Sequence, residues 1–257
     1  MDLSKFDWKF TLFGTPVRVM ATFWIICVFF SPFMSGHEGP WLFGLLGWSV
    51  ATLISFLTHE FGHAFAMRAV YGGRPTIDLG IGRSASGVPV FGGVTTSYAT
   101  SNDPLKRAFT AASGPALEIA IVFLGIALMA LLGLRFEGSL TFGIVPYLSL
   151  DPKSLAFLRS PALLFFVYYL IEGFVWIGLV WGILNLIPIF PFDGGQILLS
   201  LLSRAMGRRG TRLALGISIA LAGGLGILSF KARAYFMAFF LIFSAYQNYR
   251  LLTSRGY

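Results

Sequence analysis

Residues 41–63 have the sequence WLFGLLGWSVATLISFLTHEFGH, and this stretch decides the fold class of the chain. Its first eighteen residues, 41–58, contain no charged side chain. An uncharged, apolar run of that length predicts a helix that crosses a membrane. His59, Glu60 and His63 follow directly, so ionisable groups lie inside the expected span. Such groups are costly to place in lipid and are therefore candidates for function.

The motif His59-Glu60-Phe61-Gly62-His63 has the spacing of a zinc-protease helix. Histidines four residues apart lie one turn apart on the same helix face, where two imidazoles can occupy two corners of a zinc tetrahedron. Glu60 beside them can hold a water molecule and accept its proton. The alternative is that hydrogen bonds between helices satisfy both histidines, with Glu60 paired to an arginine. With three histidines and eleven acidic residues in the chain, chance seldom produces the motif, and we favour one zinc site.

The composition places the chain among polytopic membrane proteins. It has 257 residues, of which 56% are hydrophobic and 12% are charged, and its mean hydropathy is +0.77. A soluble domain carries about 25% charged residues. The length allows a single membrane-embedded domain over residues 1–257 and leaves no soluble stretch long enough for a second. The single cysteine, Cys27, cannot form an internal disulfide.

Apolar runs predict an all-α polytopic fold with about six membrane-spanning helices. They cover residues 19–34, 41–66, 108–133, 161–187, 213–230 and 234–249. The last two runs belong to a C-terminal helical pair, 213–257, which we expect to be scaffold because its spans hold no acid or histidine. The connection 134–160 has mixed charge and prolines, and we expect a loop there.

The formal charge of +8 is explained by topology. With the N-terminus inside, fourteen of the nineteen basic residues fall in cytoplasmic segments and five fall outside. Basic residues gather on the cytoplasmic side of membrane proteins. We therefore expect a multi-pass protein of the cell (inner) membrane with both termini cytoplasmic, surrounded by the lipid bilayer, and no nucleic-acid partner.

Residues 74–98 differ in composition from the apolar runs around them. They are rich in glycine and β-branched residues, with a turn-like Ser-Ala-Ser-Gly in the middle. This pattern predicts a β-hairpin or small sheet at the cytoplasmic face of the membrane. Two interpretations are open. The hairpin is either a plain connection or an exposed edge that pairs with an extended substrate segment by strand addition.

Zinc needs a third protein ligand. The candidates are His37, Cys27, Glu118, Glu172 and Asp193. Asp193 is favoured by its surroundings in NLIPIFPFDGG, residues 185–195. Two prolines break the helix after Asn185, and the glycine pair lets the backbone bend and approach another element closely. Broken backbone at membrane depth is tolerated only where it faces protein or a water-filled cavity.

Depth supports the pairing of Asp193 with the histidines. His59 lies nine residues before Arg68, which is roughly 14 Å along a helix at 1.5 Å per residue. Asp193 lies eleven residues before Arg204, which is roughly 16 Å by the same count. Both side chains are therefore expected at a similar depth below the cytoplasmic face.

Glu118 and Glu172 each interrupt an otherwise apolar run. A carboxyl group there must be neutral, paired or exposed to water. One interpretation is a protonated acid that is hydrogen-bonded to a neighbouring helix. The other is a gate or a residue that lines a water path to the zinc. Both remain open.

With these motifs in place, the sequence resembles the site-2 protease family of intramembrane zinc metalloproteases, in a minimal form without PDZ or CBS domains. HEFGH at 59–63 and NLIPIFPFDGG at 185–195 carry the resemblance; the second is similar to the family's Asn-x-x-Pro-x-x-Pro-Leu-Asp-Gly-Gly segment. Weaker matches are the run 14–19 before the first span, Gly92-Gly93 after the hairpin, and Gly114-Pro115 in the third span.

The resemblance implies a function and a set of site residues. His59, His63 and Asp193 would bind Zn²⁺, Glu60 would be the general base, and Asn185 would help to hold the substrate carbonyl or its oxyanion. The substrates would be transmembrane proteins, cleaved within or near their membrane spans in regulated intramembrane proteolysis.

Three positions depart from the family's pattern. The family commonly has asparagine where this chain has Glu118, often has histidine where it has Met20, and has leucine where it has Phe192. None of these is an expected zinc ligand, so the departures bear on substrate handling rather than on the reaction.

Other classes fit the sequence less well. A membrane zinc protease acting on prenylated C-termini would need a glutamate ligand downstream of the motif, in a Glu-x-x-x-His segment that is missing here. A serine intramembrane protease would need Gly-x-Ser-Gly, and Ser113-Gly114 lacks the first glycine. The remaining alternative is a zinc or cation transporter, or a non-catalytic membrane scaffold. Replacing Glu60 by glutamine separates these classes, because only a protease would lose peptide cleavage.

Overall fold

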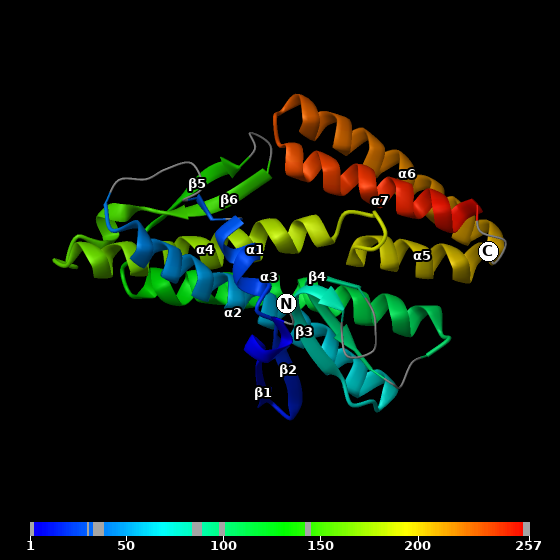
Figure 1. Ribbon diagram of the computed structural model, residues 1–257, viewed down its shortest axis with the longest axis horizontal. Helices are drawn as coiled ribbons and strands as arrows, with labels where there is room; N and C mark the ends of the chain where they lie inside the picture. Colours follow the sequence, from blue (N-terminus) through cyan, green and yellow to red (C-terminus); the bar gives the residue numbers. More distant parts are fainter. Residues whose placement is uncertain are drawn as a thin grey trace. The chain divides into compact units, whose positions relative to one another are not determined.

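The structure, a computed structural model, describes residues 3–29, 31–32, 39–83, 89–97, 101–141 and 145–253 (Figure 1). Internal contacts divide the chain into two compact units. Unit 1 consists of Met1–Ala99 and Ala116–Gly182, and unit 2 consists of Thr100–Pro115 and Ile183–Tyr257.

The helices of unit 1 are built from the predicted apolar runs. They are α1 (Phe23–Phe29), α2 (Trp41–Tyr71), the larger part of α3 (Pro104–Leu131) and nearly all of α4 (Pro161–Asn185), with short 3₁₀ turns at Leu3–Phe6 and Pro152–Leu155. Helix α2 ends at Gly72, whose left-handed backbone (φ 67°) lets its N–H donate to the Arg68 carbonyl. Glycine adopts this conformation at little cost and therefore stops the helix.

Glycines on α4 allow the helices of unit 1 to pack closely. A Cβ atom at Gly173 would lie 3.0 Å from the Ala51 side chain of α2. A Cβ atom at Gly178 would overlap with Val122 of α3. Small residues at such crossings let helix backbones approach, which is how helices associate in lipid.

A four-stranded sheet completes unit 1, in the order β1-β2-β3-β4. Its strands are β1 (Trp8–Leu12), β2 (Thr15–Val19), β3 (Thr76–Arg83) and β4 (Pro89–Thr96). Strands β1 and β2 are antiparallel, as are β3 and β4, but β2 runs parallel to β3 with Val17 opposite Ile77. Because α1 and α2 lie between β2 and β3 in the chain, the sheet joins segments on both sides of the motif helix.

The hairpin predicted at 74–98 is present as β3 and β4, whereas two other expectations for this sheet were wrong. Gly92-Gly93 lies inside β4 rather than after the hairpin. The predicted span 19–34 begins in a strand, since Val19 is the last residue of β2, and its helix α1 has seven residues. Strands β1 and β2 were missed because they are five residues long and precede the first apolar run.

The connection 134–160 is a second hairpin rather than a loop. It contains β5 (Phe136–Thr141) and β6 (Val145–Leu150), paired antiparallel. Glu172 of α4 binds this hairpin: its Oε1 accepts from the Ser149 hydroxyl at 3.0 Å, and its Oε2 accepts from the Leu150 N–H at 2.9 Å. Among the described residues, the hydrogen-bond partners of Glu172 therefore lie on this hairpin.

Unit 2 contains the first turns of α3 and three further helices, α5 (Asp193–Met206), α6 (Arg208–Lys231) and α7 (Tyr235–Thr253). Helices α6 and α7 run antiparallel side by side (Figure 1). Gly226 of α6 permits this contact, since a Cβ atom there would lie 2.9 Å from Ile242 of α7.

Four helices in the described part of the chain are long and apolar enough to cross a membrane: Trp41–Tyr71, Pro104–Leu131, Pro161–Asn185 and Arg208–Lys231. The predicted count of about six spans is therefore not confirmed. Helix α1 is far shorter than the roughly 20 residues that a span needs. The class itself, a mostly helical membrane protein with a small sheet, is as predicted, with more strand than the single expected hairpin.

Candidate metal centre

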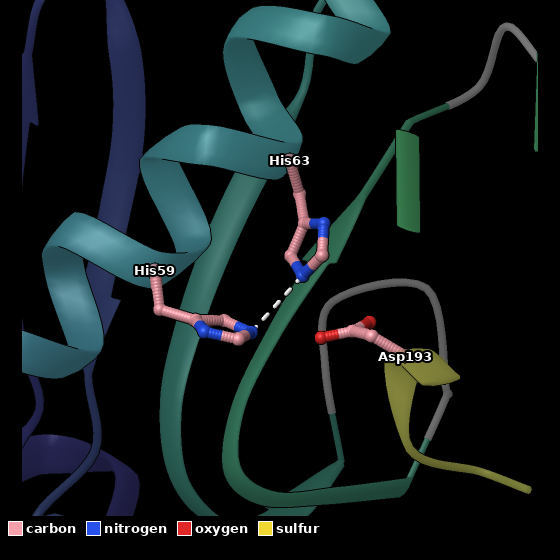
Figure 2. Close-up of side chains that lie close together, drawn as sticks. All are labelled: His59, His63 and Asp193. Atoms are coloured by element: carbon pink, nitrogen blue, oxygen red, sulfur yellow. Dashed lines mark hydrogen bonds between the residues drawn. The ribbon is translucent and has the colours of Figure 1, made fainter. Parts of the chain in front are cut away.

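The two motif histidines lie on the regular, buried part of α2. His59 is 4% exposed and His63 is 8% exposed. Their rings are nearly perpendicular, with centroids 4.9 Å apart, and His63 Nε2 lies 3.1 Å from His59 Nε2 (Figure 2). The spacing of four residues therefore has the predicted effect, because it brings two ring nitrogens face to face one helical turn apart.

The other nitrogen of His59 contacts a carboxyl group. Its Nδ1 lies 2.8 Å from Oε2 of Glu118 on α3, and Glu118 is fully buried at 0% exposure. Sequence reasoning weighed Glu118 as a zinc ligand, an uncharged acid bonded to another helix, or a gate. The structure places it behind His59, on the far side of the ring from His63.

Glu60 is held by strand β4. The Thr95 hydroxyl lies 2.7 Å from Oε2 of Glu60 and 3.0 Å from its carbonyl oxygen. A Cβ atom at Gly93 would overlap with the Glu60 carboxyl group in its present position, and glycine leaves that position free. Sequence reasoning did not predict these contacts. The signal that could have found them is the small-residue pattern Gly-Gly-Val-Thr in a strand that follows the motif helix.

In unit 2, Asp193 is the first residue of α5 and is 5% exposed. The segment between Asn185, where α4 ends, and Asp193 is broken as predicted, because its two prolines cannot continue a helix. The glycine pair that follows meets its own segment closely. A Cβ atom at Gly194 would overlap with the Leu186 carbonyl, and one at Gly195 would overlap with the Phe190 backbone.

Polar side chains of α6 and α7 satisfy the backbone of this broken segment. The Ser218 hydroxyl accepts from the Phe190 N–H at 3.1 Å and donates to the Pro188 carbonyl at 3.4 Å. The Asn248 amide donates to the Phe190 carbonyl at 2.6 Å. Backbone groups away from water need such partners, since leaving one unpaired costs about 1–3 kcal/mol. The C-terminal pair therefore supports the Asp193 segment by specific hydrogen bonds.

His59 and His63 in unit 1 and Asp193 in unit 2 are all buried and are of residue types that can bind a metal ion. Each side chain offers one ligand atom, a ring nitrogen or a carboxylate oxygen (Figure 2). Two nitrogen ligands bound to a tetrahedral zinc at about 2.0–2.1 Å lie roughly 3.3–3.4 Å apart, close to the 3.1 Å between the two Nε2 atoms. Two imidazoles and one carboxylate are also a ligand set found in catalytic zinc sites. The residues present therefore fit this metal.

The other candidate ligands lie elsewhere. Cys27 is fully buried among apolar side chains of unit 1, including Val19 and Phe23. Glu172 bonds the β5–β6 hairpin. His37 falls outside the described residues. Asn185, which was expected to hold the oxyanion and not the metal, is the buried last residue of α4.

Comparison with known families identifies the chain. A family model described as peptidase family M50 matches residues 48–225, a region that includes the motif at 59–63 and the segment at 185–195. The chain belongs to peptidase family M50. As a member of that family with four apolar helices, it is a multi-pass integral membrane protein.

Individual members of the M50 family give further detail. Rip3 of Mycobacterium tuberculosis, a protein named as a zinc metalloprotease, is 30% identical over 184 residues in each of two strains. The match covers 71% of this chain and 37% of the relative, so the chain spans little more than a third of that protein. A solved structure, the site-2 protease from Methanocaldococcus jannaschii, has the same fold, with a TM-score of 0.54 and 19% identity over 98% of this chain and 99% of that one.

Proposed function

We propose that this M50 member is an intramembrane zinc metalloprotease that hydrolyses peptide bonds within or near the membrane spans of other proteins. The observation that carries the proposal is the buried His59–Glu60–His63 turn, in which Thr95 holds the acid and the two imidazole nitrogens face each other. The family membership supports the same function. We further propose that the two units work as one protease domain.

His59, His63 and Asp193 would hold one zinc ion per chain in this proposal. Zinc supplies Lewis-acid chemistry when bound: it polarises the scissile carbonyl and makes water more acidic. The burial of all three side chains supports the role, because a water-poor site strengthens each electrostatic contact.

Glu60 would act as the general base and then as the general acid. Its carboxylate takes a proton from the attacking water and later delivers it to the leaving amine nitrogen. The contact from Thr95 to Oε2 supports this assignment, because it fixes one oxygen of the carboxyl group. The second oxygen, Oε1, is the one that Gly93 leaves room for.

Asn185 would stabilise the charge that develops on the substrate oxygen. Its side-chain amide can donate a hydrogen bond to an oxyanion, a contact worth roughly 3 kcal/mol in other proteases. Its burial at the end of α4, just before the broken segment, supports a role at the site rather than at the surface.

The substrate would be a transmembrane segment that unwinds locally. Peptide carbonyls in a helix are hydrogen-bonded and shielded, so they must be freed before attack. Strand β4 supports a further proposal, that the unwound segment binds by strand addition. Among the described strands β4 pairs with β3 alone, and it contacts α2 through Thr95 and Glu60. An edge strand beside a general base can align an extended peptide by backbone hydrogen bonds.

The distribution of basic residues supports a placement in the cell membrane with both termini cytoplasmic. In that orientation water would reach the site from the cytoplasmic side. Cysteine labelling of single-cysteine variants from either side of sealed vesicles measures the sidedness directly.

The function is tested with purified protein reconstituted in liposomes with a single-span model substrate. Wild type should cleave the substrate within its span and contain about one zinc per chain by mass spectrometry. Glu60→Gln should lose cleavage by roughly 10²–10⁴-fold and keep its zinc, because general-base catalysis contributes about that factor. Glu172→Gln is the matched control, since it is the same change at an acid that bonds the β5–β6 hairpin, and it should retain cleavage. Ion flux without proteolysis would favour a transporter instead.

A further inference from the structure

Glu118 is a buried carboxyl group that has no role in the proposed reaction. It lies on α3 and is fully buried. Its Oε2 lies 2.8 Å from Nδ1 of His59, within the same unit. The contact is a direct one between two side chains that are 59 residues apart in the sequence.

The packing around Glu118 is fitted to this carboxyl group. Gly182 of α4 lies beside it, and a Cβ atom at Gly182 would be 3.3 Å from Oε2 of Glu118 and 3.0 Å from Cγ1 of Ile119. Any larger residue at position 182 would therefore crowd the oxygen that contacts His59. Gly182 on α4 thus leaves the space in which Oε2 of Glu118 on α3 points at Nδ1 of His59.

The geometry assigns His59 a fixed ring orientation. A neutral imidazole that offers the lone pair of Nε2 carries its proton on Nδ1, and Oε2 of Glu118 is placed to accept a hydrogen bond from that N–H. The ring then cannot rotate without breaking the bond, and its Nε2 stays directed at His63 Nε2, 3.1 Å away. A carboxylate behind a metal-binding histidine fixes its tautomer and its orientation.

We propose that Glu118 is a positioning residue for the metal centre, which holds the His59 imidazole in the orientation and tautomer that bind the ion. This inference rests on the proposed zinc site and deepens it by adding a residue behind one ligand. Loss of such a partner typically weakens metal binding by about 10–100-fold.

Zinc affinity, rather than activity, tests the proposal. The dissociation constant is measured on the full-length protein in detergent by competition with a chromophoric chelator. Glu118→Ala removes the acceptor, and we expect its zinc dissociation constant to rise about 10–100-fold. Glu118→Gln keeps one acceptor oxygen, and we expect a smaller rise. Glu172→Gln is the matched control and should bind zinc as wild type does.

Two further measurements separate positioning from simple packing. Thermal unfolding of the metal-free proteins reports packing alone, and Glu118→Gln, which preserves size, should unfold within a few degrees of wild type. The absorption spectrum of the cobalt-loaded protein reports the ligand geometry, and it should change in Glu118→Gln but not in Glu172→Gln. If Glu118→Ala does not fold, Glu118→Gln and Glu118→Asp supply the affinity and the spectrum.

The outcomes distinguish this inference from the proposed function. If wild type binds no zinc, or binds it equally well after His59→Ala, both proposals are overturned. If wild type binds zinc through His59 but Glu118→Gln and Glu118→Asp have the affinity and cobalt spectrum of wild type, the positioning role alone is overturned. Weaker binding and an altered spectrum in folded Glu118 variants support it.

Discussion

The motif turn of α2 and the segment 185–193 supply the proposed site residues by different physical means. The turn belongs to a helix of 31 residues, and its backbone makes its own hydrogen bonds. The segment has no such regularity, and two of its residues, Pro188 and Phe190, bond side chains of α6 and α7. The first region is encoded locally, whereas the second depends on residues that follow it in the chain.

This difference predicts different responses to mutation. In the motif turn, a small change should alter the chemistry and leave the fold intact, because the helix does not need the altered side chain. In the 185–193 segment, a change of similar size should alter the backbone itself and with it the position of Asp193. Three glycine and amide substitutions test this contrast.

The largest effect is expected at Gly194. Its Cβ atom in Gly194→Ala would overlap with the Leu186 carbonyl, a backbone atom that cannot move without changing the whole segment. We expect a loss of stability of about 1–3 kcal/mol together with the loss of stoichiometric zinc, measured by chemical unfolding and metal analysis. Gly216→Ala, on α6 with open space around it, is the control. Normal zinc content in Gly194→Ala would show that the position of Asp193 does not depend on the backbone of the 185–193 segment.

A smaller effect, confined to the chemistry, is expected at Gly93. The Cβ atom of Gly93→Ala would meet the carboxyl end of Glu60, which can swing aside because it is the tip of a flexible side chain. Cleavage should fall by about 10–100-fold through the displaced base, with zinc content and unfolding unchanged. Cleavage assays and metal analysis on one preparation check this. Unfolding as severe as that of Gly194→Ala would show that the two regions do not differ.

The smallest effect is expected at Asn248, which acts on the segment from a distance. Asn248→Ala removes the donor to the Phe190 carbonyl, and we expect a loss of about 0.5–1.5 kcal/mol of stability, the net contribution of one hydrogen bond. Zinc affinity should fall slightly, because Asp193 follows three residues later. Ser244→Ala on the same helix is the control, since its hydroxyl bonds a carbonyl of its own helix. If the two variants are equally stable, the hydrogen bond from α7 does not stabilise the 185–193 segment.

The parts of the molecule that were predictable from the sequence are those with a local signal. Helix α2 follows from an uncharged run, the close approach of His59 and His63 follows from helical periodicity, and the break before Asp193 follows from two prolines. The hairpin of β3 and β4 has its own pattern of glycine and β-branched residues. Each of these features needs only residues that are near one another in the chain.

The remaining features depend on pairings between distant residues. Strand β2 pairs with β3 across the whole motif helix, and the Glu118–His59 contact joins residues 59 positions apart. Strands β1 and β2 are too short to have a clear pattern of their own. The count of about six spans is not confirmed for a related reason. The apolar run 19–34 reflects composition alone, whereas its first residue, Val19, belongs to a strand and pairs with Leu79 elsewhere in the chain.

The turn between β1 and β2 has a practical consequence for work on this protein. Arg68, in the last turn of α2, donates to the Phe13 carbonyl at 2.9 Å and to the Thr15 hydroxyl at 2.7 Å. The opening residues thus brace the end of the helix on which His59 and His63 stand. A shortened gene that starts at the first apolar run would delete these contacts, so an affinity tag belongs at the other terminus.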